Sequence, residues 1–221
     1  MKTAIRTMTM TAATALILGL PAPASAQAND PDAYGDGYQS GAYGRIRAAD
    51  GGASIVRADG ERDDSDGASV NAPLFPGDLL RTNQDQRVEV QLAGTSTVRI
   101  DRGGEIVFQS LPNPSAIFQD NTVLALNAGV IRVASHLGEK EEFRIDTRDA
   151  SIYLLGDGEY RIETDERGGT RVSSFRGVAE VVGNDASVLV RGGQRTSVAT
   201  GSAPDSPRAY SAYASDGFDR W

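Results

Sequence analysis

Residues 76–101 carry the pattern that decides the fold, and they run PGDLLRTNQDQRVEVQLAGTSTVRID. Pro76 fixes φ and Gly77 supplies a permissive backbone, so the stretch is expected to begin with a tight turn that feeds a strand. Further along, residues 88–92 alternate apolar and polar side chains, which is the period of two that a half-buried strand requires. The stretch therefore predicts short strands connected by tight turns.

Strands of this kind are expected along the chain from Tyr43 to about Thr200. Asp-Gly and Gly-Gly pairs separate them, and such pairs supply the positive φ of two-residue hairpin turns. The predicted strands are 43–48, 53–58, 79–82, 87–93, 97–101, 105–109, 116–119, 122–126, 129–135, 142–147, 150–155, 159–164, 169–175, 177–182, 186–191 and 194–199. We expect an all-β fold of many short, mostly antiparallel strands, forming a twisted sandwich or a compact β-solenoid-like body with disordered termini.

The predicted core consists of apolar side chains on one face of these strands. They are Val88, Val90, Leu92, Val98, Ile100, Ile106, Phe108, Leu124, Leu126, Val130, Phe143, Ile145, Tyr160, Ile162, Val178 and Val188. The chain contains no cysteine. Burial and hydrogen bonding, rather than disulfides, must therefore hold the fold together.

Two segments of the predicted strands are similar to each other. Residues 126–133 run LNAGVIRV and residues 174–181 run SFRGVAEV, each with a glycine at a corner before an alternating strand. The similarity fits a fold in which similar β-layers stack, although a solenoid usually needs three or more units. Chance recurrence of Gly-Val-x-x-Val in a β protein explains the pair equally well, so both interpretations stay open.

The first 26 residues are expected to be a cleaved signal peptide. Two basic residues precede a short apolar stretch, and Ala24 and Ala26 have the spacing of a cleavage site before Gln27. The apolar stretch is shorter than the ~20 residues that span a bilayer, and no later segment of the mature chain is suited to crossing one. The mature protein is therefore expected in the periplasm or outside the cell.

One β domain is expected between two tails. Residues 27–42 form a flexible N-terminal segment, residues 43–200 form the β domain, and residues 201–221 form a tail that contains tyrosine and tryptophan. Loss of two basic residues with the signal peptide shifts the formal net charge from −8 to −10. This acidic balance disfavours a nucleic-acid partner, because neutralising phosphates requires basic patches.

Aromatic residues are concentrated in the tails. Tyr210, Tyr213, Phe218 and Trp221 lie near the C-terminal end, and tyrosine and tryptophan are enriched at interfaces because they bury a large area at low entropy cost. These four are the candidate partner-binding residues. The alternative is that the tails fold back and cover an edge of the domain, since exposed aromatics favour aggregation.

No catalytic constellation is recognised, so we expect a protein that is not an enzyme, with no cofactor and no metal site. The mature chain has a single histidine, His136, and it lacks both cysteine and a Gly-x-Ser-x-Gly elbow. Asp63, Asp64 and Asp66 suggest a loose calcium contact. Arg62 and Pro73 occupy the first and twelfth ligand positions of the calcium-loop pattern and exclude an EF-hand. A solvated Asp-Gly turn is favoured over the loose contact.

The order of several short motifs resembles the FecR domain, a bacterial periplasmic module. The motif residues are Gly77, Asp78, Thr82, Gly129, Thr147, Gly177, Gly193 and Gln194. Family members with a membrane span and a cytoplasmic helical domain relay transporter occupancy to a sigma factor. This chain is instead similar to secreted, stand-alone FecR-like proteins, in which a Phe-Asp-x-Trp segment like residues 218–221 follows the domain. It departs from the family pattern at Arg148, where proline is usual.

Two functions are compatible with the sequence. The first is an exported, non-enzymatic binding, scaffold or signalling-related module of the cell envelope. Such a module would contact a protein or an envelope polymer through a sheet edge, a sheet face or the aromatic tail. The second is a polysaccharide-binding or polysaccharide-acting protein that uses surface carboxylates such as Asp157 and Glu159. A deep cleft holding a carboxylate pair favours the second function, and a flat surface favours the first.

Overall fold

This computed structural model describes residues 43–60, 62–63, 68–92, 95–113, 120–164, 168–211 and 216–221. Every regular element in these ranges is a strand, so the predicted all-β class is confirmed. No helix in the described ranges is long and apolar enough to cross a membrane. The predicted signal peptide with its cleavage site at Ala24, Ala26 and Gln27 lies outside these ranges, as do residues 27–42 and the side chains of the calcium candidates.

The strands follow the predicted ranges closely. In chain order they are β1 (Gly44–Asp50), β2 (Ser54–Val56), β3 (Arg62–Asp63), β4 (Pro73–Leu74), β5 (Leu79–Arg81), β6 (Arg87–Leu92), β7 (Thr97–Ile100), β8 (Glu105–Ser110), β9 (Asp120–Ser135), β10 (Glu141–Asp146), β11 (Ser151–Leu154), β12 (Gly158–Thr164), β13 (Thr170–Arg176), β14 (Val178–Gly183), β15 (Ala186–Arg191), β16 (Gln194–Val198) and β17 (Arg208–Ala209). The predicted strand at 116–119 lies outside the described residues.

The strands form two arrays that share the long strand β9. In sheet 1 the order is β4-β1-β6-β7-β9-β12-β13-β16-β17. In sheet 2 the order is β3-β2-β5-β8-β9-β10-β11-β14-β15. Among the described strands, neighbours are antiparallel except for β9 and β10, which are parallel. The mostly antiparallel arrangement was predicted.

Strand β9 belongs to both sheets because it bends at Gly129. Its first part pairs with β8 and β10 in sheet 2, and residues 129–135 pair with β12 in sheet 1. Gly129 has a φ of 95°, and a Cβ atom there would lie 2.7 Å from the Cα of Gly104. Both the backbone angle and the lack of space require glycine at this corner.

The second of the two similar segments also passes between the sheets at a glycine. Gly177 lies between β13 of sheet 1 and β14 of sheet 2, with a φ of 87°. A Cβ atom at this position would lie 2.6 Å from the carbonyl oxygen of Asp157. The two similar segments therefore share one structural feature, a crowded glycine corner at which the chain passes from one sheet to the other.

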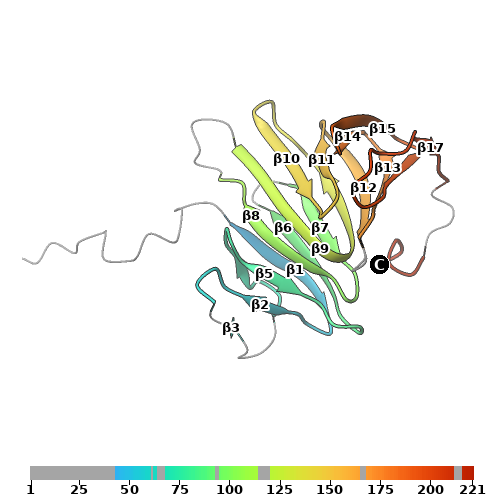
Figure 1. Ribbon diagram of the computed structural model, residues 1–221. Coiled ribbons are helices and arrows are strands. Elements are labelled where there is room, and N and C mark those ends of the chain that lie inside the picture. Colours follow the sequence, from blue (N-terminus) through green and yellow to red (C-terminus); the bar gives the residue numbers. More distant parts are fainter. Residues whose placement is uncertain are drawn as a thin grey trace, which may run out of the picture. The chain divides into compact units, whose positions relative to one another are not determined.

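Beyond β9 the chain changes sheet after every second strand. Strands β10 and β11 extend sheet 2, β12 and β13 extend sheet 1, β14 and β15 return to sheet 2, and β16 and β17 complete sheet 1. Figure 1 shows this progression from the blue and teal N-terminal strands to the orange and red C-terminal ones. Because each pair of strands is added to the earlier strands of the same sheet, the arrangement combines a sandwich with solenoid-like addition of strands.

The core lies between the two sheets and is continuous. Val90 and Ile131 of sheet 1 join Phe108 and Ile145 of sheet 2 in one cluster of buried apolar side chains. Thirteen of the sixteen predicted core residues are buried, as the alternating patterns indicated. Burial of such side chains between the sheets, at roughly 25 cal/mol per Å² of apolar surface, is the main stabilising term of the fold.

Three predicted core residues, Val130, Val178 and Val188, are only partly buried. Ile131 and Ala179 occupy the inner positions instead and are fully buried. Val130 and Val178 each follow a corner glycine, and the positive φ there determines which alternate side chains face the core. A one-residue error in that phase moves every side chain to the other face of the strand.

The C-terminal segment packs against the domain. The expected disorder at this end of the chain is therefore wrong for residues 201–211 and 216–221. Strand β17 pairs with β16 through the Gln194–Ala209 and Arg195–Arg208 partners. Phe218 is 1% exposed. The aromatic residues of this segment account for the difference, because polar composition alone suggested a free tail.

Candidate binding surfaces

A row of arginines crosses the outer face of sheet 1. Arg99 of β7 lies opposite Arg132 of β9, and Arg132 lies opposite Arg161 of β12. Farther along the same register, Ser173 of β13 separates Arg161 from Arg195 of β16. We call Arg99, Arg132, Arg161 and Arg195 the arginine row. Like charges directly opposite each other destabilise a sheet, so the row depends on the groups around it.

An aromatic ring lies over each arginine of the row. The pairs, with the distance from guanidinium carbon to ring centroid, are Arg99 with Trp221 (5.9 Å), Arg132 with Phe175 (4.7 Å), Arg161 with Phe218 (5.9 Å) and Arg195 with Tyr210 (4.0 Å). Such cation–π contacts contribute ~0.5–1 kcal/mol each when exposed and more when water is excluded. Three of the four rings belong to the tail, which therefore covers much of the row.

Two tail carboxylates neutralise the middle of the row. Asp216 Oδ2 accepts a hydrogen bond from Arg161 Nη2 at 2.8 Å. Asp219 Oδ1 lies 3.0 Å from Arg161 Nη1 and 3.5 Å from Arg132 Nη1. The Asp219 side chain is only 4% exposed. The Asp219 side of the cluster is therefore largely desolvated, whereas the Asp216 side chain is 50% exposed. Removal of Asp219 would leave an uncompensated charge.

The ionisation of the cluster follows from these contacts. The hydrogen bond from Arg161 is the main reason that the pKa of Asp216 is lowered to about 2, and partial burial opposes it. For Arg161, burial works against the charged form. The hydrogen bond to Asp216 and the charges of Glu163 and Asp219 outweigh that effect, so the pKa of Arg161 is raised. Both partners are thus charged at neutral pH.

Residues 216–221 hold their position through side chains and a local turn. Asp216 Oδ1 accepts hydrogen bonds from the backbone N–H groups of Phe218 and Asp219 at 2.9 and 3.1 Å. Arg87 Nη1 donates to the Gly217 carbonyl at 3.4 Å. The Phe218 ring has Arg87 on one flank, 5.7 Å from its centroid, and Arg161 at 5.9 Å. Figure 1 shows the segment as a loop beside β9 and β12.

The predicted partner-binding residues differ in how far they are buried. Phe218 is buried, Tyr210 and Trp221 are partly buried, and Tyr213 lies outside the described residues. The tail folds back on the domain, as the alternative interpretation held, and it covers a sheet face as well as pairing at an edge. Binding of a partner by these residues stays a prediction.

Two motif residues of the FecR pattern fix turns near the start of the domain. Asp78 is 2% exposed and accepts hydrogen bonds from Arg57 Nη1 at 2.6 Å and from the Phe75 N–H at 2.9 Å. Thr82 Oγ1 donates to the Asp101 carbonyl at 2.6 Å and accepts from a backbone N–H at 2.8 Å. These contacts satisfy buried polar groups of the turns.

The other motif residues have comparable structural positions. Thr147 Oγ1 and Thr170 Oγ1 share a hydrogen bond of 2.7 Å. Gln194 Oε1 accepts from the Arg191 N–H at 2.9 Å and so closes the turn between β15 and β16. The motif glycines have positive φ: Gly77, Gly129, Gly177 and Gly193. These motif residues therefore lie at corners and turns of the fold.

The residues considered for catalysis lie at the surface or in ion pairs. His136 is exposed, and its Nδ1 lies 3.7 Å from Asp157 Oδ2. The Glu159 carboxylate lies 3.1 Å from Arg132 and 3.9 Å from Arg176. Within the described ranges, no group of three or more His, Cys, Asp or Glu side chains is placed to hold a metal ion.

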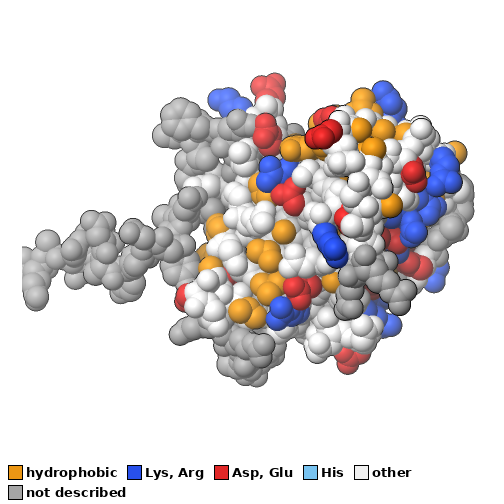
Figure 2. All heavy atoms as spheres, in the orientation of Figure 1, with side chains coloured by type: hydrophobic (Ala, Val, Ile, Leu, Met, Phe, Trp, Pro, Cys, Tyr) orange, Lys and Arg blue, Asp and Glu red, His pale blue; other side chains and the backbone are white. Residues whose placement is uncertain are grey.

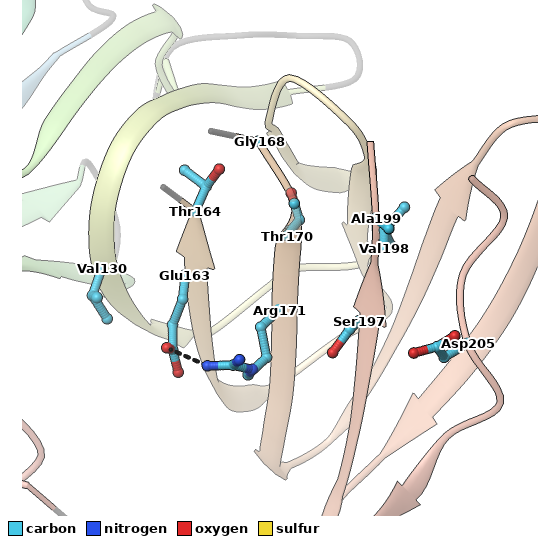
Figure 3. A pocket seen from close by; sticks show the side chains of 11 residues that line it. Val130, Glu163, Thr164, Gly168, Thr170, Arg171, Ser197, Val198, Ala199 and Asp205 are labelled. Carbon is cyan, nitrogen blue, oxygen red and sulfur yellow. Dashed lines mark hydrogen bonds and ion pairs between the residues drawn. The ribbon is translucent and has the colours of Figure 1, made fainter. Parts of the chain in front are cut away.

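A pocket of about 460 Å³ lies where the hairpin of β12 and β13 meets β16. Figure 3 shows Glu163 and Arg171 joined on one side of it, with Asp205 on the other. The Glu163–Arg171 distance is 3.1 Å, and Glu163 also accepts a hydrogen bond from Arg161 at 3.0 Å. Glu163, the glutamate that lines this pocket, is thus held by two arginines.

Strand β15 forms an open edge of sheet 2. It pairs with β14 on one side, and no strand in the described part of the chain pairs with its other side. The Leu155 N–H donates to the Val178 carbonyl at 3.0 Å, so Val178 points its backbone toward β11 and away from β15. Antiparallel alternation then directs the backbone N–H and C=O groups of Ser187 and Leu189 to the open edge.

The composition of β15 leaves this edge unprotected. Natural edge strands are usually blunted by lysine, proline or a bulge, whereas β15 is a regular six-residue strand with the sequence ASVLVR. Leu189 is 40% exposed. Figure 2 shows hydrophobic side chains gathered over the region of β11, β14 and β15. The edge therefore combines unpaired backbone groups with apolar surface, which is typical of strand-addition sites.

Comparison with known proteins finds a family that is similar to part of this chain. Residues 78–180 match the family model described as FecR protein. The FecR resemblance stated from the sequence is therefore confirmed over these residues. No curated protein matches the chain.

Solved structures extend the likeness of the fold. Two crystal structures of a candidate anti-sigma factor from Parabacteroides distasonis ATCC 8503 are similar to this chain, each with a TM-score of 0.51. Sequence identity is 17% and 16%, and 61% of this chain is covered in both cases. The chain spans 60% of the length of those structures. At this identity the likeness establishes a shared fold.

Proposed function

We propose that this protein is an exported, non-enzymatic binding module of the bacterial cell envelope, which takes part in signalling by holding an extended segment of a partner protein. The open edge of β15 carries the proposal. Backbone groups of Ser187 and Leu189 point away from β14 there, beside the exposed Leu189 side chain. An extended peptide added to such an edge gains main-chain hydrogen bonds for affinity and side-chain contacts for specificity.

Four further points support this function. The FecR match over residues 78–180 supports a regulatory module, and the similar structures are described as a candidate anti-sigma factor. The predicted signal peptide supports an envelope location. The ion-paired state of Glu159 speaks for a structural role of this carboxylate.

The sequence also suggested an alternative, a polysaccharide-directed protein that uses Asp157 and Glu159. Glu159 is shared between two arginines, and Asp157 accepts a hydrogen bond from the Leu137 N–H at 2.9 Å. Neither contact favours sugar chemistry over a structural role. Polysaccharide binding is therefore an outcome of the test rather than a second proposal.

A pair of substitutions at Leu189 tests the proposal. Leu189→Pro removes the N–H at the open edge while leaving the hydrogen bonds to β14 in place, because proline is tolerated where the N–H faces outward. Leu189→Ala removes the same side chain and keeps the N–H. The mature protein and both variants would be immobilised, and capture of proteins from the envelope fraction of the source bacterium would be quantified.

We expect Leu189→Pro to weaken capture of a specific protein about tenfold relative to Leu189→Ala, the effect of ~1.4 kcal/mol from one edge hydrogen bond. Melting temperatures of the variants establish that both are folded. Equal capture by the two variants would contradict the strand-addition mechanism. Retention of the protein on protein-free envelope polysaccharide, with no protein captured, would favour the alternative function.

A further inference from the structure

We propose that the outer face of sheet 1, centred on Arg161 and Arg132, is a recognition surface for acidic–aromatic protein segments, and that residues 216–221 are the ligand that occupies it in cis. The ligand chemistry is a phenylalanine between two carboxylates three residues apart, followed by a tryptophan. This surface lies on the other sheet from β15, so the inference stands independently of the function proposed above.

The surface has a slot for the aromatic ring. Phe218 lies between Arg87 and Arg161, whose guanidinium carbons are 5.7 and 5.9 Å from its centroid, and it is 1% exposed. The slot is lined by charged groups, whereas the apolar core lies on the opposite face of the same strands. A phenylalanine with two guanidiniums within 6 Å of its ring centroid is bound by cation–π attraction as well as by burial.

The arginines are oriented by carboxylates of the sheet itself. Arg87 Nε donates to Asp101 Oδ1 at 2.7 Å, and Arg161 Nε donates to Glu163 Oε1 at 3.0 Å. Each guanidinium has five N–H donors in a fixed fork, so these contacts fix its plane and leave donors for another acceptor. Those remaining donors bind Asp216, Asp219 and the Gly217 carbonyl. The surface is therefore preorganised by residues that are not part of the ligand.

The ligand is short and has hydrogen bonds of its own. Asp216 Oδ1 accepts hydrogen bonds from two N–H groups within the segment, and these stabilise a turn in it. The contacts with the arginines are made by side chains and two backbone carbonyls, Gly217 and Asp219. A six-residue peptide carries all of these groups, and a turn stabilised by its own hydrogen bonds lowers its ordering cost. A partner segment of the same chemistry can thus compete with residues 216–221.

The first experiment vacates the surface in the full chain with Phe218→Ala. A fluorescently labelled peptide with the sequence DGFDRW, that of residues 216–221, is titrated against this variant and against the unaltered chain. We expect the peptide to bind the variant at least tenfold more tightly, because the segment in cis competes at an effective concentration on the order of mM. Circular dichroism confirms that the variant remains a β protein.

Control peptides identify the chemistry. Replacing both aspartates of the peptide by asparagine, or its phenylalanine by alanine, is expected to weaken binding at least tenfold. Raising the salt concentration from 50 to 500 mM is expected to weaken binding of the unaltered peptide, since charge pairs carry part of the affinity. No binding to the folded variant, or binding that the asparagine substitutions leave unchanged, would overturn the proposal.

A second measurement uses the unaltered chain in case Phe218→Ala does not fold. A peptide in which phenylalanine replaces tryptophan is added at millimolar concentration, and the emission of Trp221, the single tryptophan of the chain, is followed. A saturable red shift supports displacement of the cis segment, and no shift up to 10-fold excess over the expected effective concentration, ~1 mM, contradicts it. A dimer of the chain that requires Asp216 and Asp219 would also support the surface, with a second copy as the source of the segment.

Discussion

Arg132 of β9 lies directly opposite Arg161 of β12 in the antiparallel register of sheet 1. The carboxylate of Asp219 contacts both guanidiniums, at 3.5 and 3.0 Å. Two like charges at this spacing are unfavourable in a sheet without a counter-charge. The tail is thus part of the electrostatic balance of the domain, and the stability of the sheet and the docking of the tail are coupled.

We expect Asp219→Asn to lower the free energy of unfolding by about 3 kcal/mol, because it removes one partner of a desolvated charge cluster. The matched control is Asp205→Asn. Asp205 is 61% exposed and lies 4.0 Å from Arg208, so its loss should change stability by less than ~0.5 kcal/mol. Urea unfolding followed by circular dichroism measures both values. Equal effects of the two substitutions would show that the cluster is not desolvated.

Docking of the tail should weaken in acid. Asp216 has a usual pKa of 3.8 and a pKa of about 2 in the folded chain, mainly through the hydrogen bond from Arg161. A lowered pKa means that the stabilising effect is complete above the unfolded value and is lost as the pH falls from about 4 towards 2. Trp221 emission should therefore change in that window in the unaltered chain.

The control for the acid titration is Asp216→Asn, which has no titrating group at this position. Its Trp221 emission should lack the step assigned to Asp216 and should resemble the acid form already at neutral pH. A step of the same size in the variant, or a midpoint well above pH 4, would assign the change to another carboxylate.

Gly129→Ala should destabilise the domain more than the same substitution at a glycine that has a similar positive φ but enough space for a Cβ atom. Gly129 has a φ of 95° and lacks space for a Cβ atom, whereas Gly193 has a φ of 80° and no atom within 4 Å of the place that a Cβ atom would take. We expect about 1 kcal/mol for Gly193→Ala and roughly 2–4 kcal/mol for Gly129→Ala. Thermal or urea unfolding would measure the difference, and similar losses would show that the corner can relax.

Phe143→Ala should cost about 3–5 kcal/mol, as expected for a large side chain removed from a packed core. Phe143 is 2% exposed in β10. Leu155→Ala is the matched control, since Leu155 is 54% exposed and its truncation should cost less than ~0.5 kcal/mol. A shift in melting temperature of less than a degree for Phe143→Ala would place this residue outside the core.

The alternation of apolar and polar residues predicted most strands, and it failed where backbone geometry rather than side-chain pattern decides. Residues 122–126 and 129–135 were expected as two strands with a corner at Gly129, yet they form the continuous strand β9. A glycine at positive φ can end a strand or bend one, and sequence does not distinguish these outcomes. The two-residue strands β3, β4 and β17 are too short to show a period.

The candidate site was predicted only in part, because its halves are distant in sequence. The aromatic residues of the tail were predicted as binding residues. The arginines that contact them were not, because they are distributed over separate strands. One signal was present in the sequence. Arginine stands between two core residues in Val98-Arg99-Ile100, Ile131-Arg132-Val133 and Tyr160-Arg161-Ile162. This pattern places each guanidinium on an outer face, but only the strand register places the three side by side.

Site-specific photo-crosslinking in living cells tests the central claim, that β15 holds a segment of a partner protein. A photoreactive amino acid would replace Leu189 at the open edge or, as a control, Val70, which is 50% exposed and lies in the turn that precedes β4. We predict a discrete adduct with an envelope protein from position 189 and none from position 70. No adduct at position 189, or the same adducts from both positions, would contradict binding at this edge.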